Sequence, residues 1–230
     1  MSARRRFVGE IAGAGTSDGH RVVIGNWAVS PYGAFADVMH QGPDGVRTLF
    51  APDEAIASFV RTTYHFDAVR LGTVTVDRTD DRLHLRTNGL ELDLRLGRRT
   101  ALGWLLRTVP RPIATAPWWC AAIDPVARRV VDGVRTRGSA GNDRREWYGA
   151  TDQHRIVSCS GCLDGEPIGA LADVWPPVTF GFSSTPRTPA IVSVTTTIEM
   201  SDADPRGFDR YGGGGRESNP PDEDRSSQPL

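Results

Sequence analysis

The sequence predicts an α+β fold: a mostly antiparallel β-sheet or barrel with two or three packed helices and a disordered C-terminal tail. Short runs of alternating apolar and polar residues are separated by turn sequences, of which Asn88-Gly89 is the strongest hairpin signal. Fewer segments carry apolar residues at helical spacing. From residue 203 onward apolar residues almost disappear. We therefore expect one β-rich domain over residues 1–202 and a disordered tail over 203–230.

Residues 7–51 have the pattern of short strands joined by tight turns. The apolar runs are brief and partly alternating, as expected for strands with one buried face. Two of the connecting segments contain Asp-Gly pairs, and glycine readily adopts the positive φ that a tight hairpin turn requires. The expected strands are residues 7–13, 20–27, 35–40 and 46–51.

Three segments predict helices, near residues 52–63, 100–109 and 117–132. The first starts with Pro52 and two acids, which suit the positive end of a helix dipole. The second carries leucines at helical spacing. The third begins near Pro117 and ends near Gly133.

Two further regions have the pattern of strands. Leucines alternate with polar residues over 83–85 and 90–96, on either side of the Asn-Gly turn, which predicts a hairpin. Residues 147–160 and 191–200 also favour strands, the latter being rich in Val, Ile and Thr. Because strands do not alternate regularly with long helices, we do not expect a doubly wound nucleotide-binding sheet.

The chain contains no lysine: its 27 lysine and arginine residues are all arginine. Without an ε-amine there is no Schiff-base nucleophile, no anchor for pyridoxal phosphate and no phosphate-loop lysine. Arginine stays protonated, so it binds anions but is a poor base. We expect no cofactor.

The net charge of −1 hides an uneven distribution. Residues 94–155 carry 12 arginines against 5 acids, whereas residues 1–93 carry 10 against 12 and residues 156–230 carry 5 against 11. An anionic partner would therefore meet the middle of the chain. The sequence pI of about 6.5 and the lack of a known motif argue against nucleic-acid binding.

The sequence indicates a cytoplasmic protein. An acid at position 10 follows the N-terminal arginines closely, which leaves no apolar signal segment. No apolar run approaches the roughly 20 residues that a membrane-spanning helix needs. Cys159 and Cys162 have the spacing of metal or redox motifs, but the usual second pair of ligands is missing, so we expect no metal site.

The densest polar cluster of the sequence lies in residues 135–154. Arg137, Arg144 and Arg145, together with Tyr148, are the candidate ligand-binding residues. Guanidinium groups bind carboxylates and phosphates bidentately, and aromatic rings supply apolar contact. This combination predicts a site for a small anionic ligand.

The same segment contains three candidate catalytic residues, Glu146, Asp152 and His154. Alternation along a strand that begins at Trp147 predicts that these three and Tyr148 share one face. Asp152 and His154 would then form a general acid/base pair. The alternative is a solvated loop leading into an edge strand, with its ion pairs at the surface.

Residues 125–129 (Pro-Val-Ala-Arg-Arg) and 180–186 (Phe-Gly-Phe-Ser-Ser-Thr-Pro), with the polar segment above, resemble a family of uncharacterised proteins from high-GC Gram-positive bacteria. That family has no assigned activity, so it implies no catalytic residues. Residues 30–37 (Ser-Pro-Tyr-Gly-Ala-Phe-Ala-Asp) and Trp147-Tyr148 more faintly resemble acetoacetate-decarboxylase-like barrels. This resemblance implies a barrel but not the activity, because the Schiff-base lysine of those enzymes has no counterpart here.

Residues 94–123 combine five arginines and three tryptophans with no acid. A cationic helix with tryptophans can lie on a membrane surface or bind an acidic partner. Alternatively, the leucines and tryptophans cover the sheet while the arginines extend into water. We expect burial, because an open sheet face has to be covered.

Three functions follow from these observations. We favour a binding module for a small anionic or amphipathic molecule. The first alternative is a lysine-independent hydrolase, lyase or isomerase that uses Asp152 and His154. The second is a peripheral protein that attaches to a membrane or a partner through residues 94–123. The sequence does not indicate an oligomeric state.

Overall fold

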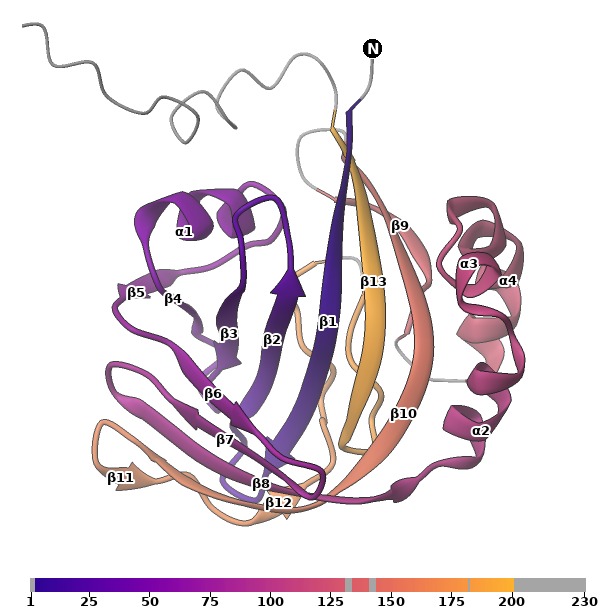
Figure 1. Cartoon of the computed structure of the whole chain (residues 1–230). Coiled ribbons are helices and arrows are strands. Elements are labelled where there is room, and N and C mark those ends of the chain that lie inside the picture. Colours follow the sequence, from indigo (N-terminus) through magenta and orange to yellow (C-terminus); the bar gives the residue numbers. More distant parts are fainter. Residues whose placement is uncertain (1–2, 131–133, 141–143, 182, 201–230) are drawn as a thin grey trace, which may run out of the picture.

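The computed structural model describes residues 3–130, 134–140, 144–181 and 183–200. The predicted tail at 203–230 lies outside these residues. Within them, thirteen strands form one sheet and four helices lie against it (Figure 1). The predicted α+β class with a mostly antiparallel sheet is confirmed.

The strands and helices have the following bounds. The strands are β1 (Ala3–Thr16), β2 (Arg21–Val29), β3 (Phe35–Gln41), β4 (Arg47–Ala51), β5 (Ala68–Leu71), β6 (Thr75–Arg78), β7 (Arg82–Arg86), β8 (Leu90–Arg99), β9 (Arg137–Ala140), β10 (Arg144–Leu163), β11 (Glu166–Pro167), β12 (Leu171–Ala172) and β13 (Ala190–Met200). The helices are α1 (Glu54–Arg61), α2 (Ala101–Thr108), α3 (Arg111–Ala114) and α4 (Pro117–Val130).

The strands follow the order β5-β4-β3-β2-β1-β13-β10-β8-β7-β6, with β9 and β11 paired to β10 and β12 paired to β1. Among the described strands, β4 and β5 run parallel, joined through α1, and the other pairs are antiparallel. The sheet curls until β6, β7 and β8 lie across from β1–β4, which gives a half-barrel (Figure 1).

The concave face of the half-barrel carries the largest apolar core. Leu85, Leu92 and Leu94 of β7 and β8 belong to one buried cluster with Ile24 of β2 and Val38 of β3. Because leucines alternate strictly with other residues in β7 and β8, their side chains all lie on this face. Burial of their side chains holds the two ends of the curled sheet together.

The convex face is covered by α1 and by the segment around residues 174–180. Ile56 and Val60 of α1 pack with Leu49 of β4, and Val23 of β2 packs with Phe180. The Asp53 carboxylate caps α1 by accepting a hydrogen bond of 2.9 Å from the N–H of Ile56.

The other three helices pack along β10, on the side of the molecule away from α1 (Figure 1). Two glycines permit this close packing, because a Cβ at Gly103 would overlap the Gln153 carbonyl oxygen and one at Gly149 would overlap that of Ala114. Helices α1, α2 and α4 fall within the predicted helical segments, and α3 adds a single turn. None of the described helices has the length and apolar character needed to cross a membrane.

Candidate functional site

The polar segment in which we predicted the site contains a β-bulge. Ala150 of β10 pairs with Val194 of β13, but Asp152 pairs with Ser193, so Thr151 is one residue in excess. A bulge of this kind reverses the alternation of side chains beyond it. Even-numbered side chains therefore lie on one face of the sheet before Thr151 and on the other face after it.

The prediction that Glu146, Tyr148, Asp152 and His154 share one face is wrong for this reason. The first two lie on the convex face, where they contact Tyr64. The other two lie on the opposite face and meet β8 and α2 instead. The candidate catalytic carboxylates are thus separated by the sheet itself.

Glu146 forms a buried cluster with two tyrosines. Its side chain is 0% exposed, and its Oε2 atom accepts hydrogen bonds from the hydroxyls of Tyr148 at 2.9 Å and Tyr64 at 3.2 Å. The two hydroxyl oxygens are 2.5 Å apart. Burial and the negative charge of Glu146 raise the pKa of both tyrosines well above the usual value. The tyrosines therefore remain neutral donors to an internal carboxylate.

Asp152 is held by arginines rather than by His154. Arg99 donates to its two oxygens at 2.7 and 2.9 Å, and Arg107 lies 3.5 Å away. Burial alone would raise the pKa of Asp152. The hydrogen bonds from Arg99 outweigh this effect, and the pKa of Asp152 lies below its usual value. His154 Nε2 is 3.8 Å from the carboxylate, and its Nδ1 faces the Gly97 carbonyl at 3.3 Å. A carboxylate held in this way is a weak base.

The candidate ligand-binding arginines do not line a described pocket. Arg137 and Arg145 are both exposed, and the side chain of Arg144 lies outside the described residues. The backbone N–H of Arg137 donates to Asp124, a carboxylate of the chain itself, at 3.2 Å. Two pockets of the described residues, one lined by His20 and His40 and the other by Gly72 and Arg86, include no residue of 135–154.

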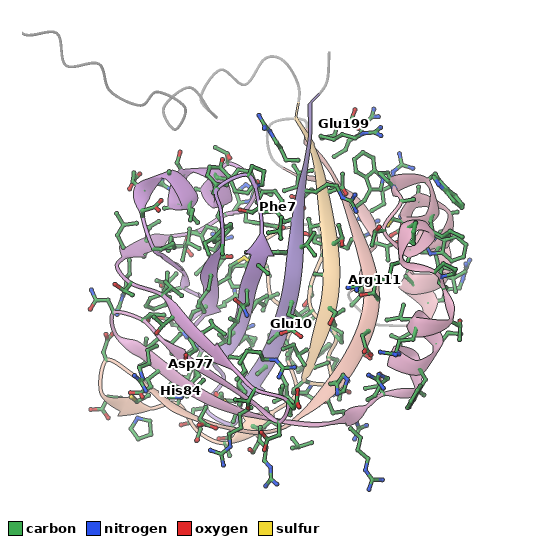
Figure 2. All side chains as sticks on the ribbon, in the orientation of Figure 1. Phe7, Glu10, Asp77, His84, Arg111 and Glu199 are labelled. Atoms are coloured by element: carbon green, nitrogen blue, oxygen red, sulfur yellow. The ribbon has the colours of Figure 1, made fainter. Side chains whose placement is uncertain are left out.

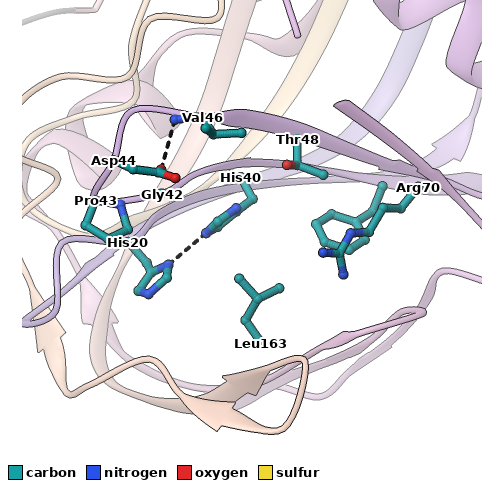
Figure 3. A pocket seen from close by; sticks show the side chains of 10 residues that line it. His20, His40, Gly42, Pro43, Asp44, Val46, Thr48, Arg70 and Leu163 are labelled. Atoms are coloured by element: carbon teal, nitrogen blue, oxygen red, sulfur yellow. Dashed lines mark hydrogen bonds between the residues drawn. The ribbon is translucent and has the colours of Figure 1, made fainter. Parts of the chain in front are cut away.

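A pocket of about 360 Å³ opens at one end of the concave face, where the β1–β2 turn and the β3–β4 hairpin meet β5 and the end of β10 (Figure 3). Both polar and apolar side chains line this pocket. Its lining consists of His20, His40, Gly42, Pro43, Asp44, Val46, Thr48, Phe50, Arg70 and Leu163.

The register of the sheet brings these residues together. His40 of β3 pairs with Thr48 of β4, and Phe50 of β4 pairs with Arg70 of β5, so all four side chains share the concave face. Arg21 fixes the turn that closes one wall, because its buried guanidinium donates to the Gly42 carbonyl at 2.9 Å. The pocket is therefore built on strands rather than on loops alone.

His20 and His40 form a hydrogen-bonded pair, with His20 Nδ1 2.9 Å from His40 Nε2 (Figure 3). The rings are stacked, with centroids 5.2 Å apart. In a neutral pair one ring donates to the other, so the two outer nitrogens, His20 Nε2 and His40 Nδ1, present one donor and one acceptor. Within the described residues, neither outer nitrogen has a hydrogen-bond partner.

Burial keeps this pair uncharged at neutral pH. It lowers the pKa of His40 to about 4, with the neighbouring His20 ring as a second cause. Burial also lowers the pKa of His20, despite the nearby Asp18 and Asp44 carboxylates. The pair can therefore accept and donate hydrogen bonds without carrying charge.

Arg70 forms the cationic wall of the pocket, but its charge is neutralised. Its guanidinium donates to both oxygens of Asp164 at 2.6 and 2.8 Å and lies 5.5 Å above the Phe50 ring. The charged groups that act on the two histidines are Asp18, Arg21, Asp44 and Arg70, and together with Asp164 their charges sum to −1. Such a pocket does not attract anions.

Sequence reasoning missed the histidine pair, because the two residues are 20 positions apart and lack metal-binding spacing. A usable signal lay in the hairpin between them. Val22 pairs with His40, and His20 lies two residues before Val22 on the same face, which makes the histidines diagonal neighbours. Fixing the register of this hairpin would have predicted their contact.

The cysteines do not form a site in the described part of the chain. Cys159 pairs with Leu94 and Cys162 with Glu91, so the two thiols point to opposite faces of β10. Burial raises the pKa of Cys159 and of Cys120 to about 11. No group of three or more His, Cys, Asp and Glu side chains among the described residues is arranged to hold a metal ion.

Comparisons with known proteins add little to this geometry. No protein-family model matches the chain, and no curated protein does. A solved structure of acetoacetate decarboxylase from Legionella pneumophila is similar at 11% sequence identity and a TM-score of 0.41, over 86% of this chain and 84% of that chain. No family model supports the resemblance to an uncharacterised family of high-GC Gram-positive bacteria.

Proposed function

We propose that the protein is a binding module for a small, uncharged amphipathic molecule that carries a hydroxyl group, and that the pocket at His20 and His40 is its site. The observation that carries this proposal is the neutral histidine pair. Its two outer nitrogens offer one donor and one acceptor, and a hydroxyl group, which can both donate and accept, can bind to either of them.

The rest of the pocket suits the apolar part of such a ligand. Phe50, a neighbour of His40 on the adjacent strand, and Leu163 provide apolar surface in the same pocket. A volume of about 360 Å³ lies within the usual range for small-molecule sites. The open end of a half-barrel is also a common position for such sites.

The charges favour an uncharged ligand over the anionic one that we expected from the sequence. Asp164 neutralises Arg70, and Asp44 adds a negative charge to the wall. The exposed Arg137 and Arg145, which we had expected to bind the anion, do not line this pocket. An anion would therefore meet net repulsion at the histidine pair.

The enzyme alternative has less support. Arg99 holds both oxygens of Asp152, and the sheet separates Asp152 from Glu146. A general base needs a free lone pair directed at its substrate. We therefore propose binding rather than catalysis.

Three probes with the same ring and different charges test the proposal: benzyl alcohol, benzoate and protonated benzylamine. We expect benzyl alcohol to shift the NMR signals of the His20 and His40 rings. Benzoate should bind roughly fivefold more weakly, because one net negative charge a few ångströms away costs about 1 kcal/mol in a partly solvated pocket.

A pair of matched substitutions provides the control. His20→Asn keeps a polar atom near the position of Nδ1 but removes Nε2, so it should abolish the response to benzyl alcohol. His84→Asn makes the same change on β7, outside the pocket, and should have no effect. Tighter binding of benzoate, or an equal loss in both variants, would contradict the proposal, as would a lack of response to all three probes.

A further inference from the structure

The outward sides of α2, α3 and α4 expose large apolar side chains. Trp104 and Leu105 of α2 are 60% and 63% exposed, and Trp118 of α4 is 63% exposed. Ile113 of α3 and Val126 of α4 are also exposed. Half of the ten exposed large hydrophobic side chains in the described part of the chain lie on these three helices. Our expectation that the leucines and tryptophans of this segment cover the sheet is therefore wrong for Trp104, Leu105 and Trp118.

The packing of the helices on β10 fixes this orientation. Gly103, Ala114, Cys120 and Asp124 are the buried residues on the inner sides of the helices. Because a Cβ at Gly103 would overlap the backbone of Gln153, α2 lies directly on the strand and cannot rotate about its axis. Trp104 and Leu105 are thereby directed away from the sheet.

The described residues of the same three helices include exposed arginines and no exposed acid. Between residues 94 and 130 Asp124 is the sole acid, and it is buried, hydrogen-bonded to the N–H of Thr136 at 2.9 Å and paired with Arg128. Figure 2 shows Arg111 on this side of the molecule, and its side chain is exposed. The exposed arginines on these three helices are Arg107, Arg111, Arg128 and Arg129.

We propose that the helical surface formed by α2, α3 and α4 docks on an anionic lipid membrane. Exposed tryptophans partition into the interface between headgroups and acyl chains, and arginines bind lipid phosphates. Juxtaposed basic residues strengthen binding to anionic leaflets, because each lies within a Debye length of the surface charge. The surface therefore combines the two signals that peripheral membrane attachment requires.

A lipid surface fits these observations better than an acidic protein. The apolar side chains are distributed over three helices, and neither described pocket is lined by any of them. A protein partner would need a complementary, well-packed core at its interface. A fluid membrane accommodates separate aromatic side chains without such complementarity.

Co-sedimentation with vesicles tests the proposal. We expect the full chain to sediment at low salt with vesicles of phosphatidylcholine containing about one-third phosphatidylserine, and at least about tenfold less with phosphatidylcholine alone. Physiological salt should weaken the binding, because it screens the arginines. Arg111→Gln with Arg129→Gln should reduce binding and flatten its dependence on salt.

A matched tryptophan control is available in the chain. Trp104 lies beneath the Arg99 guanidinium, with 4.6 Å from Cζ to the ring centroid. Trp175 lies outside the helices, is 59% exposed and has Arg187 at 4.9 Å in the same arrangement. Trp104→Ala with Trp118→Ala should lower vesicle binding by about tenfold, whereas Trp175→Ala should leave it unchanged. Thermal unfolding establishes that each variant is folded.

Several results would overturn the proposal. Equal sedimentation with neutral and anionic vesicles would remove the role of charge. An equal loss in the Trp175 variant would show nonspecific adsorption. Retention on polyglutamate without sedimentation on any vesicle would assign the surface to an acidic protein partner instead.

Discussion

Asp37 is a buried carboxyl group whose ionisation opposes folding. It lies on β3 of the convex face, and the described structure gives it a hydrogen bond of 3.0 Å from Trp27 Nε1. Burial raises its pKa to about 7, and the bond from Trp27 offsets only part of this effect. Folding therefore favours the protonated form of Asp37, whose contribution to stability is present below pH 3.8 and lost as the pH rises through about 7.

Replacing Asp37 with Asn should stabilise the protein at alkaline pH. The shift from 3.8 to about 7 corresponds to roughly 4 kcal/mol of penalty for the ionised form. Asn keeps the acceptor for Trp27 and cannot ionise, so the variant should gain up to a few kcal/mol over the parent at pH 8 and none at pH 4. Urea unfolding at both pH values measures this, and a difference independent of pH would contradict the assignment.

At the scale of elements, sequence patterns predicted which segments are helices and strands better than they predicted which side faces the core. The leucine alternation of β7 and β8 placed the concave core correctly, because strand parity there is uninterrupted. In β10 the bulge at Thr151 broke the same rule, and a single extra residue moved Asp152 to the other face.

Helix α2 shows the same limit. Its apolar residues follow helical spacing, but Trp104 and Leu105 lie outward while the small Gly103 lies against β10. Periodicity identifies the apolar side of a helix. It does not show whether that side or the side with a glycine packs against the neighbouring strand. The histidine pocket was missed for a related reason, because it depends on the register between strands.

Gly103→Ala should destabilise the protein although alanine is the better helix former. The propensity gain is at most about 1 kcal/mol, whereas forcing a methyl group against the Gln153 backbone costs about 1–3 kcal/mol. We expect a net loss of about 1–2 kcal/mol in the free energy of unfolding. Leu105→Ala is the control, since an exposed leucine should cost less than about 1 kcal/mol. A loss in the Leu105 variant as large as in the Gly103 variant would mean that α2 packs in another orientation.

For the whole molecule, two buried groups have opposite effects on acid stability. The pKa of His40 is lowered to about 4, so its contribution is fully present above pH 6.5 and is lost as the pH falls towards 4. Asp37 contributes in the opposite direction over nearly the same range. The pKa shifts of His40 and Asp37 correspond to roughly 3 and 4 kcal/mol, respectively, and their effects on the free energy of unfolding have opposite signs.

The contributions of Asp37 and His40 to the free energy of unfolding of the parent protein should therefore almost cancel between about pH 4.5 and about 6.5. What remains is the contribution of His20, whose pKa is also lowered, so the stability of the parent should fall only slightly as the pH is lowered. Asp37→Asn should expose the His40 effect, with stability falling as the pH is lowered. His40→Gln should expose the Asp37 effect, with stability rising as the pH is lowered. Urea titrations of the three proteins decide the question, and parallel pH profiles would refute the compensation.

The neighbours of β13 have a consequence for biosynthesis. This strand is the last of the sheet to leave the ribosome, and it inserts between β1, the first, and β10. Until it emerges, both of those strands present unpaired N–H and C=O groups over the stretches that β13 later covers, which is the condition for pairing with other chains. The addition of β13 therefore closes two open strand edges at once, along which incomplete copies of the chain can pair with one another.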